Sequence, residues 1–144
     1  MAQLSVCIEM LFKEYDFLDR IDMTAKAGFP AVEFWDWHEK DIAAIKKRAR
    51  GAGVQVAGFT GNMAALTTDT QYSPLVPQRR DEFLEQIRRA TGIANDLACE
   101  TIIVLSGNAR SGVSDQEQRA ALVESLSQAA MIAEQGDVTL VLEP

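Results

Sequence analysis

The sequence predicts an α/β fold in which helices cover a parallel sheet. Two observations support this prediction: short apolar runs recur along the chain, and a segment with apolar residues at helical spacing separates each run from the next. A strand of a parallel sheet is buried on both faces, so its sequence is nearly continuous in apolar residues. With 144 residues and 47% hydrophobic content, the chain can form one domain, which we expect to span residues 1–144.

Five apolar runs are the predicted strands. Each is short, as strands in globular proteins are, and none alternates strictly between apolar and polar residues. In chain order they are residues 4–10, 31–35, 54–59, 101–105 and 138–142.

Four amphipathic helices are predicted between these strands. In each gap, apolar residues recur at a spacing of three or four, which places them on one face of a helix. The four faces are Phe17, Ile21 and Ala25; Ile42, Ile45 and Ala49; Phe83, Ile87, Ala90, Ala94 and Leu97; and Leu122, Leu126, Ala129 and Ala133. Gly28, Gly53 and Gly136 follow the first, second and fourth faces, where a helix can end.

The start of the last helix is marked by residues 114–117, which have the Ser-x-x-Glu form of a capping box. In this motif the side chains of Ser114 and Glu117 satisfy backbone N–H groups that the first turn leaves without partners. We therefore expect the helix to begin directly after Ser114.

Two architectures share this order of elements. A doubly wound open sheet of about five strands would be complete, whereas a (β/α)8 barrel takes about 250 residues. Residues 9–13 follow the first strand in place of a glycine-rich phosphate loop, which disfavours a dinucleotide-binding sheet. We predict the N-terminal portion of a TIM (β/α)8 barrel, truncated after strand five, with strand order 1-2-3-4-5. The alternative is a flavodoxin-like binding domain with order 2-1-3-4-5.

Charge and cysteine usage narrow the partners and the compartment. Lys and Arg total 14 against 21 Asp and Glu, so neither nucleic acid nor a membrane surface is an expected partner. Arginines 79, 80, 88 and 89 lie among acidic residues at helical spacing, which predicts a solvated, salt-bridged face. Cys7 and Cys99 lie in or beside apolar runs and are predicted to be buried, reduced thiols. With no secretory leader and no membrane-spanning run, we expect a cytoplasmic protein.

The candidate site lies at the carboxyl ends of the predicted strands, where parallel α/β folds place their functional residues. Glu143 closes the fifth strand, and a carboxylate there suits a divalent cation or proton transfer, although a solvated glutamate is the alternative. Glu33 lies within the second strand, where it is either a buried structural carboxylate or a catalytic one. The weaker candidates for substrate binding are Trp35, His38, Asn62 and Ser106. The long connection at residues 61–77 is either a lid or an ordinary loop.

Three segments carry a resemblance to a known family. Residues 10–18 (MLFKEYDFL), 28–34 (GFPAVEF) and 142–144 (LEP) resemble the hydroxypyruvate isomerase family of xylose-isomerase-like TIM barrels. The resemblance implies interconversion of hydroxypyruvate and tartronate semialdehyde by proton transfer, assisted by a divalent cation such as Mg²⁺ or Mn²⁺. It makes Glu143 both a metal ligand and the acid/base residue, with the other ligands on strands six to eight. Where the family carries a histidine beside an asparagine after strand three, this chain has residues 60–62 (TGN), so only Asn62 matches.

Several functional hypotheses remain open at this level. The chain derives from a hydroxypyruvate isomerase, from a related sugar or 2-oxo acid isomerase or epimerase, or it is a catalytically inactive half-barrel fragment. A half barrel would leave strands one and five with unpaired edges, so we expect a homo-oligomer.

Overall fold

The structure is a computed structural model that describes residues 4–67 and 71–144. The strands are β1 (Ser5–Cys7), β2 (Ala31–Phe34), β3 (Gln55–Thr60), β4 (Thr101–Leu105) and β5 (Thr139–Glu143). The helices are α1 (Phe17–Lys26), α2 (Ile42–Ala52), α3 (Ala64–Thr67), α4 (Arg80–Leu97) and α5 (Asp115–Glu134), and the 3-10 turn η1 (Pro77–Arg79) precedes α4.

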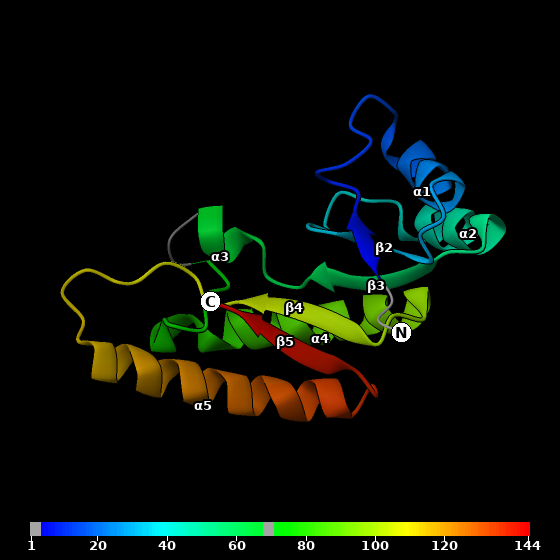
Figure 1. The fold of residues 1–144 in the computed structure, drawn as a ribbon. Helices are drawn as coiled ribbons and strands as arrows, with labels where there is room; N and C mark the ends of the chain where they lie inside the picture. The colour runs from blue at the N-terminus through cyan, green and yellow to red at the C-terminus, as the bar shows by residue number, and fades with distance from the viewer. Residues whose placement is uncertain (1–3, 68–70) are drawn as a thin grey trace.

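The five strands form one parallel sheet in the order β1-β2-β3-β4-β5. This confirms the predicted order and excludes the flavodoxin-like order. Each crossover segment places the next strand beside the last, so the sheet grows in one direction, as it does in a barrel. Figure 1 shows α1 and α2 beside β1 and β2 at one end of the sheet, and α5 along β5 at the other.

The core lies between the helices and one face of the sheet. At the first end of the sheet Phe34 is fully buried with Ile21 of α1 and Ile45 of α2, and its ring stacks on Phe59 at 5.5 Å between centroids. At the other end Ile102 and Val104 of β4 are buried with Ile87, Ala90 and Ala94 of α4. Full burial of one such side chain contributes about 1.5–3 kcal/mol. These contacts hold the helices on a single side of the sheet.

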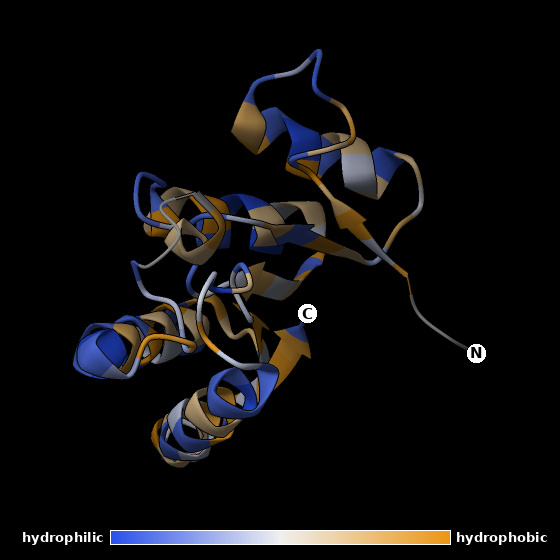
Figure 2. Ribbon diagram, turned by 90° about the vertical axis from the view of Figure 1, so that its left-hand side faces the viewer, coloured by the Kyte–Doolittle hydropathy of each residue, from blue (hydrophilic) through white to orange (hydrophobic). Residues whose placement is uncertain are grey.

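The opposite face of the sheet, which we call the open face, is covered much less. Ser5 and Ala57 are exposed there, and Val141 of β5 is 46% exposed. Leu142, on the helix side of β5, is 42% exposed because β5 is the last strand. In Figure 2 the hydrophobic strand that ends at the C-terminus lies at the border of the sheet. The strand therefore presents apolar surface on both of its faces.

The predicted strand boundaries agree with the structure to within one residue, except at the end of the first strand, which is wrong in extent. We predicted residues 4–10, whereas β1 ends at Cys7 because the N–H groups of Met10 and Leu11 donate to the Cys7 carbonyl and turn the chain. The second strand also ends one residue earlier than predicted, at Phe34. Neither α3 nor η1 was predicted from the sequence pattern of the connection at residues 61–77. Residues 68–70 lie outside the described residues, so a lid there stays a prediction.

The predicted capping box is present. Ser114 Oγ accepts a hydrogen bond from the Glu117 N–H at 3.3 Å, and the Glu117 carboxylate accepts from the Ser114 N–H at 3.0 Å. The predicted apolar face of α5 is only partly right, because Ala129 and Ala133 are buried whereas Leu122 and Leu126 are half-buried. Ser125 and Ala121 are buried in their place, so small residues face the neighbouring helix α4.

Asn62 joins the ends of β3 and β4. The backbone ladder between these strands includes only the pairs Phe59↔Ile102 and Thr60↔Ile103. Beyond it, the Asn62 amide donates to the Leu105 carbonyl at 2.9 Å, and its oxygen accepts from the Leu105 N–H at 2.8 Å. The same amide donates to the Tyr72 carbonyl at 3.1 Å, and the side chain is fully buried. One side chain thus replaces a missing strand pair and anchors the following loop.

We expect Asn62→Ala to lower the free energy of unfolding by about 2–4 kcal/mol, because it leaves buried backbone groups without hydrogen-bond partners. Urea unfolding followed by circular dichroism measures this change. Asn95→Ala is the matched control, since Asn95 is exposed on α4 and should shift stability by less than about 0.5 kcal/mol. Equal effects of the two substitutions would contradict a structural role for the Asn62 amide.

Candidate functional site

The carboxyl ends of the strands form one polar edge, and four of the predicted site residues lie along it. Thr60, two residues before Asn62, donates its N–H to the Trp35 carbonyl at 3.0 Å. On the other side Ser106 donates its N–H to the Glu143 carbonyl at 3.0 Å. The order along the edge is Trp35, Asn62, Ser106 and Glu143, which follows the order of the strands.

Glu143 ends β5 and points to the open face. Its register partner is Leu105, and Val104, the residue before Leu105, faces the core below the helices. Because side chains alternate along a strand, Glu143 lies on the opposite side from Val104. Glu143 is exposed, and its carboxylate makes no hydrogen bond or ion pair with the residues that the structure describes. A free carboxylate on a rigid strand can accept a proton or bind a cation.

The neighbours of Glu143 differ in how free their polar groups are. The Ser106 hydroxyl is half-buried and donates to the Gly107 carbonyl at 3.3 Å, a weak contact that a ligand can displace. Asn62 uses both atoms of its amide on the backbone, so it holds the edge together rather than presenting a free group. Trp35 is 40% exposed at the end of β2 and can form an apolar wall.

Glu33 also faces the open side of the sheet, which the sequence had left undecided. It is in register with Cys7, while Phe34 beside it points to the core. Ser5 donates its hydroxyl to the Glu33 carboxylate at 3.3 Å. Burial raises the pKa of the Cys7 thiol, and the charge of Glu33 adds to this effect. Glu33 is therefore a partly exposed carboxylate on the open face, about one residue before the carboxyl end of β2.

His38 lies away from this edge, in a network that links two loops to helix α4. Its ring nitrogens lie 2.6 Å from the Asp36 carboxylate and 2.8 Å from the Gln86 amide oxygen on α4. The ring also stacks on Trp37, with centroids 4.0 Å apart, and parallel to Tyr72 at 6.1 Å. Both ring nitrogens are thus occupied by the protein, so the geometry supports a structural role for His38 more than contact with a substrate.

The hydrogen bonds of this network change the pKa of the Asp36 carboxyl group. Burial alone would raise the pKa of its carboxyl group, but hydrogen bonds from the His38 ring and backbone N–H outweigh burial. The pKa of Asp36 is therefore lowered from its ordinary value, and the charge of Lys40 contributes to the same effect.

Glu9 is turned away from the other strand-end residues. The predicted strand 4–10 places Glu9 near its carboxyl end, which predicts a position on the same side as Asn62, Ser106 and Glu143. Its carboxylate instead forms an ion pair with Lys40 at 2.8 Å, and the Lys40 ammonium lies 4.8 Å from the centre of the Phe17 ring of α1. Glu9 consequently belongs to the contact between the first loop and the helix layer.

The described residues do not form a metal centre by themselves. No group of three or more His, Cys, Asp or Glu side chains within residues 4–67 and 71–144 is close enough to hold an ion. Glu143 could supply one oxygen ligand to a divalent cation, which needs six or more ligands in total.

Other sequence-level predictions about side chains are confirmed in part. Both cysteines are free, and Cys99 is buried while Cys7 is half-buried. Two of the four arginines, Arg79 and Arg88, form the predicted ion pairs along α4, with Glu82 and Glu85. Arg89 instead lies 5.0 Å above the Trp37 ring. In the part of the chain that the structure describes, no helix has the length and apolar composition to cross a bilayer.

A parallel sheet in sequential order, helices on one face and polar strand ends define a barrel-type α/β protein. The chain belongs to the xylose isomerase-like TIM barrel family, whose sequence profile matches residues 21–144. Its five strands correspond to the N-terminal portion of that barrel.

Individual relatives agree with this assignment. Hydroxypyruvate isomerase of Escherichia coli (strain K12) is 30% identical over 144 residues, which are 100% of this chain and 56% of that protein. The 2-oxo-tetronate isomerase of Cupriavidus necator is 28% identical and is matched over 55% of its length. A crystal structure described as AP endonuclease, family 2 from Brucella melitensis has a TM-score of 0.90 at 23% identity, over 100% of this chain and 55% of that one. The chain thus spans about half the length of the curated relatives that it matches.

The lowered pKa of Asp36 gives a pH-dependent prediction. A carboxyl group with a lowered folded-state pKa stabilises the protein above its unfolded pKa, near 3.8, and this stabilisation is lost as the pH falls through the folded value. We expect Asp36→Asn to cost about 0.5–1 kcal/mol at pH 7, since the group is partly exposed. The cost should shrink towards zero as the solution is acidified below that range.

Chemical unfolding of the parent and the variant between pH 7 and pH 2 measures this difference. A double-mutant cycle with His38→Asn is the control, because the Asp36→Asn effect should be smaller when the ring is absent. An effect of Asp36→Asn that is constant with pH, or unchanged in the His38→Asn background, would show that the pair does not stabilise the loop.

Proposed function

We propose that this chain forms part of an isomerase that interconverts a small hydroxy-aldehyde and keto acid pair, of the hydroxypyruvate and tartronate semialdehyde type. The observation that carries the proposal is the carboxylate of Glu143 at the carboxyl end of β5, on the open face of a barrel-type sheet, which has no ion-pair partner among the described residues. The similarity to hydroxypyruvate isomerase over the whole of this chain supports it.

The proposed chemistry of Glu143 is proton transfer. Its carboxylate removes the proton from the hydroxyl-bearing carbon next to the substrate carbonyl, and the electron pair of that C–H bond moves to give an enediolate. Return of a proton to the neighbouring carbon completes the isomerisation without net oxidation. The strand backbone holds the Glu143 carboxylate in place, because the Glu143 carbonyl is bonded to Ser106.

The surrounding side chains have supporting roles in this proposal. Trp35 provides an apolar wall and the Ser106 hydroxyl a hydrogen bond to the substrate, while Asn62 fixes the distance between the β3 and β4 ends. Glu33 lies on the same open face, further from the strand ends. Its carboxylate would contact a substrate that reaches below the strand ends. His38 orders the adjoining loops.

We propose that a divalent cation, Mg²⁺ or Mn²⁺, assists the reaction, with Glu143 as its ligand from this chain. Such an ion would stabilise the negative charge of the enediolate, but Glu143 supplies one ligand and the described residues do not complete the shell. The remaining ligands would have to come from strands outside this chain. We also propose a cytoplasmic location, which the free thiols of Cys7 and Cys99 support.

A second candidate is a related isomerase or epimerase acting on another 2-oxo acid or sugar. The observation that favours it is the near-equal identity to a 2-oxo-tetronate isomerase, 28% against 30% for hydroxypyruvate isomerase. A third is a half barrel that lacks catalytic activity, which the exposed apolar residues of β5 favour. Turnover measured with hydroxypyruvate and with 2-oxo-tetronate in parallel distinguishes the three.

In a barrel completed by further strands, we expect Glu143→Gln to reduce turnover by about 10²–10⁴-fold, because the amide cannot take the proton. The fold should persist, since glutamine has the same shape and the Glu143 carboxylate makes no hydrogen bond or ion pair with the described residues. An isomerisation assay with hydroxypyruvate, together with circular dichroism, tests both expectations. The control is Glu134→Gln, an exposed glutamate at the end of α5. If Glu143→Gln retains parental turnover, the catalytic assignment fails.

The 144-residue chain alone should show no isomerase activity at saturating Mg²⁺ or Mn²⁺, and we propose that it forms a homo-oligomer. Thr139 donates its N–H towards β4, to Glu100, and the Glu143 carbonyl accepts from Ser106. The alternate residues Leu140 and Leu142 therefore direct their backbone groups to the open edge of β5. A second copy can pair with that edge and cover the exposed apolar residues.

Light scattering should give a molar mass that is a multiple of 15.8 kDa. Leu142→Pro removes an edge N–H without touching the β4 ladder and should shift the mass towards the monomer. Leu142→Lys, which keeps that N–H, is the control and should have the smaller effect. A stable parental monomer that turns over hydroxypyruvate would disprove both parts of this prediction.

A further inference from the structure

The sheet has two outer edges, which β1 and β5 form. Within residues 4–67 and 71–144 no further strand pairs with either edge. On β1, the Ile8 N–H donates to the Glu33 carbonyl of β2 at 3.0 Å. Because backbone groups alternate in direction along a strand, Ser5 and Cys7 direct their N–H groups away from β2, to the outer edge.

The backbone groups at the two outer edges are complementary. On β5 the outward groups belong to Leu140 and Leu142, whose side chains lie on the helix side of the sheet. On β1 the outward groups belong to Ser5 and Cys7, whose side chains lie on the open face with Glu33. Neighbouring parallel strands need this combination, and the pair of β4 and β5 has it within the chain. A second copy can therefore place its β1 parallel to β5, with its helices on the same side.

Neither edge carries the features that keep an exposed strand from pairing with another chain. Proteins usually protect such a strand with charged side chains, proline or a β-bulge. Residues 4–7 (LSVC) and 139–142 (TLVL) contain no charge and no proline, and the pairs β1–β2 and β4–β5 have no register shift. Leu4 and Val141 are exposed. The charge of Glu143 lies at the last position of β5, so both edges can accept a further strand.

The chain exposes more surface than a folded monomer of its mass. Its accessible surface is 8311 Å² at 15.8 kDa. A folded monomer of that mass exposes about 7,300 Å², so this chain exposes roughly 1,000 Å² more. Each partner in a stable complex buries about 800 Å². The excess is therefore large enough for association with a second copy.

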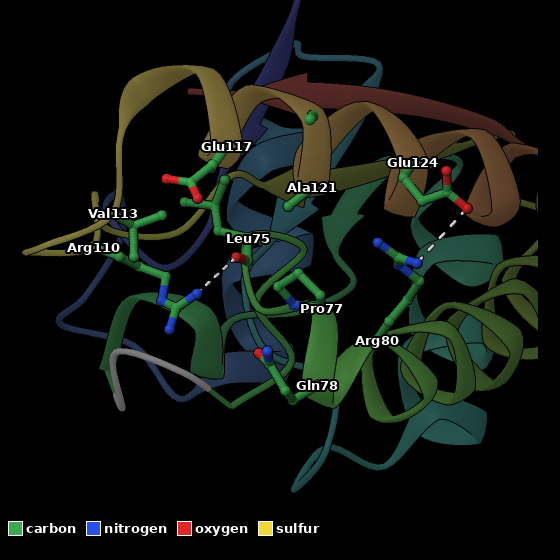
Figure 3. Close-up of a pocket in the computed structure, with 10 residues that line it drawn as sticks. Leu75, Pro77, Gln78, Arg80, Arg110, Val113, Glu117, Ala121 and Glu124 are labelled. Carbon is green, nitrogen blue, oxygen red and sulfur yellow. Dashed lines mark hydrogen bonds and ion pairs between the residues drawn. The ribbon is translucent and has the colours of Figure 1, made fainter.

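Helix α5 extends the apolar surface beside β5. It packs on α4 and β5, and the side towards α4 contains a cleft of about 630 Å³ in which Glu124 lies 3.7 Å from Arg80 (Figure 3). Away from this cleft, Val123, Leu126 and Ala130 follow one another at helical spacing, and Val123 is 59% exposed. The first helix of a second copy could pack against this stripe of α5.

We propose that two copies of the chain join edge to edge, with β5 of each copy parallel to β1 of the other. The inference rests on the homo-oligomer of the proposed function and names the edges that meet. Two copies joined through β5 alone would leave both β1 edges unpaired, whereas reciprocal contact of β5 with β1 pairs every edge through one twofold axis. Five strands from each copy then close a barrel of ten. Because all strands run in one direction, both Glu143 carboxylates lie at one mouth.

Cross-linking tests which edges meet. Val141→Cys places a thiol on the open face of β5, where it should lie near Cys7 on the open face of the other copy. A mixture of ¹⁵N-labelled and unlabelled Val141→Cys chains is treated with a short bis-methanethiosulfonate linker. Mildly alkaline solution is used because burial raises the pKa of the Cys7 thiol. We expect peptides that join position 141 of a labelled chain to Cys7 of an unlabelled one, and a molar mass of twice 15.8 kDa.

Two further variants complete the cross-linking experiment. Thr139→Cys tests the adjacent open-face position of β5, and Cys7→Ser in the Val141→Cys chain is the control that should abolish the link. Links between positions 141 of two copies, or no link to Cys7 in either cysteine variant, would overturn the arrangement and leave the homo-oligomer intact. A parental monomer would overturn both, and a mass above that of the dimer would exclude the closed barrel.

A substitution on β1 measures the same contact without a linker. Ser5→Pro removes an outward N–H, whereas Ser5→Ala keeps it, and both remove the hydroxyl that donates to Glu33 at 3.3 Å. Because the dimer loses two such N–H groups, Ser5→Pro should raise its dissociation constant about tenfold or more, and Ser5→Ala should change it less than about twofold. Sedimentation equilibrium measures both constants, and circular dichroism checks the fold. An unchanged constant for Ser5→Pro, or equal effects of the two variants, would show that β1 is not the partner edge.

Discussion

Each parallel strand needs hydrogen bonds along both edges and packing on both faces. This requirement governs the structure. The helices meet half of that need, because α1, α2 and α4 bury one face of the sheet against residues such as Phe34 and Ile102. The open face and the outer edge of β5 are left without partners among the described residues. The candidate site and the expected contact with a second copy both lie on this open face, since it exposes the Glu143 carboxylate and the apolar side chain of Val141.

Polar side chains, rather than backbone ladders, complete the strand-end region. The β3 and β4 strands separate after two register pairs, and the amide of Asn62 then takes the place of the next one. The network around His38 does the same for the loops, since it joins the segment after β2 to Gln86 on α4. Strand ends that spread apart can form a mouth for a substrate, and these buried hydrogen bonds keep the opening rigid.

The two regions of interest differ in electrostatic character. The strand-end site has negative charge at Glu143 and Glu33 that no cation among the described residues pairs with, which suits proton transfer. The cleft between α4 and α5 carries both signs of charge, because Glu117 and Glu124 line it together with Arg80 and Arg110, which Ser125 and Gln118 hold in place. Neutral anchors fix an arginine without cancelling its charge.

The sequence by itself determined the fold class, the order of the strands, the start of α5 and the position of Glu143 at a strand end. Each of these depends on local patterns, such as apolar periodicity or the Ser114 and Glu117 spacing, that hold regardless of the rest of the chain. Only the tertiary structure decided that buried Asn62 is hydrogen-bonded to Leu105, His38 to Gln86 and Arg80 to Ser125. The partners in these contacts are 43, 48 and 45 residues apart, so the register of the sheet and the path of the loops bring them together.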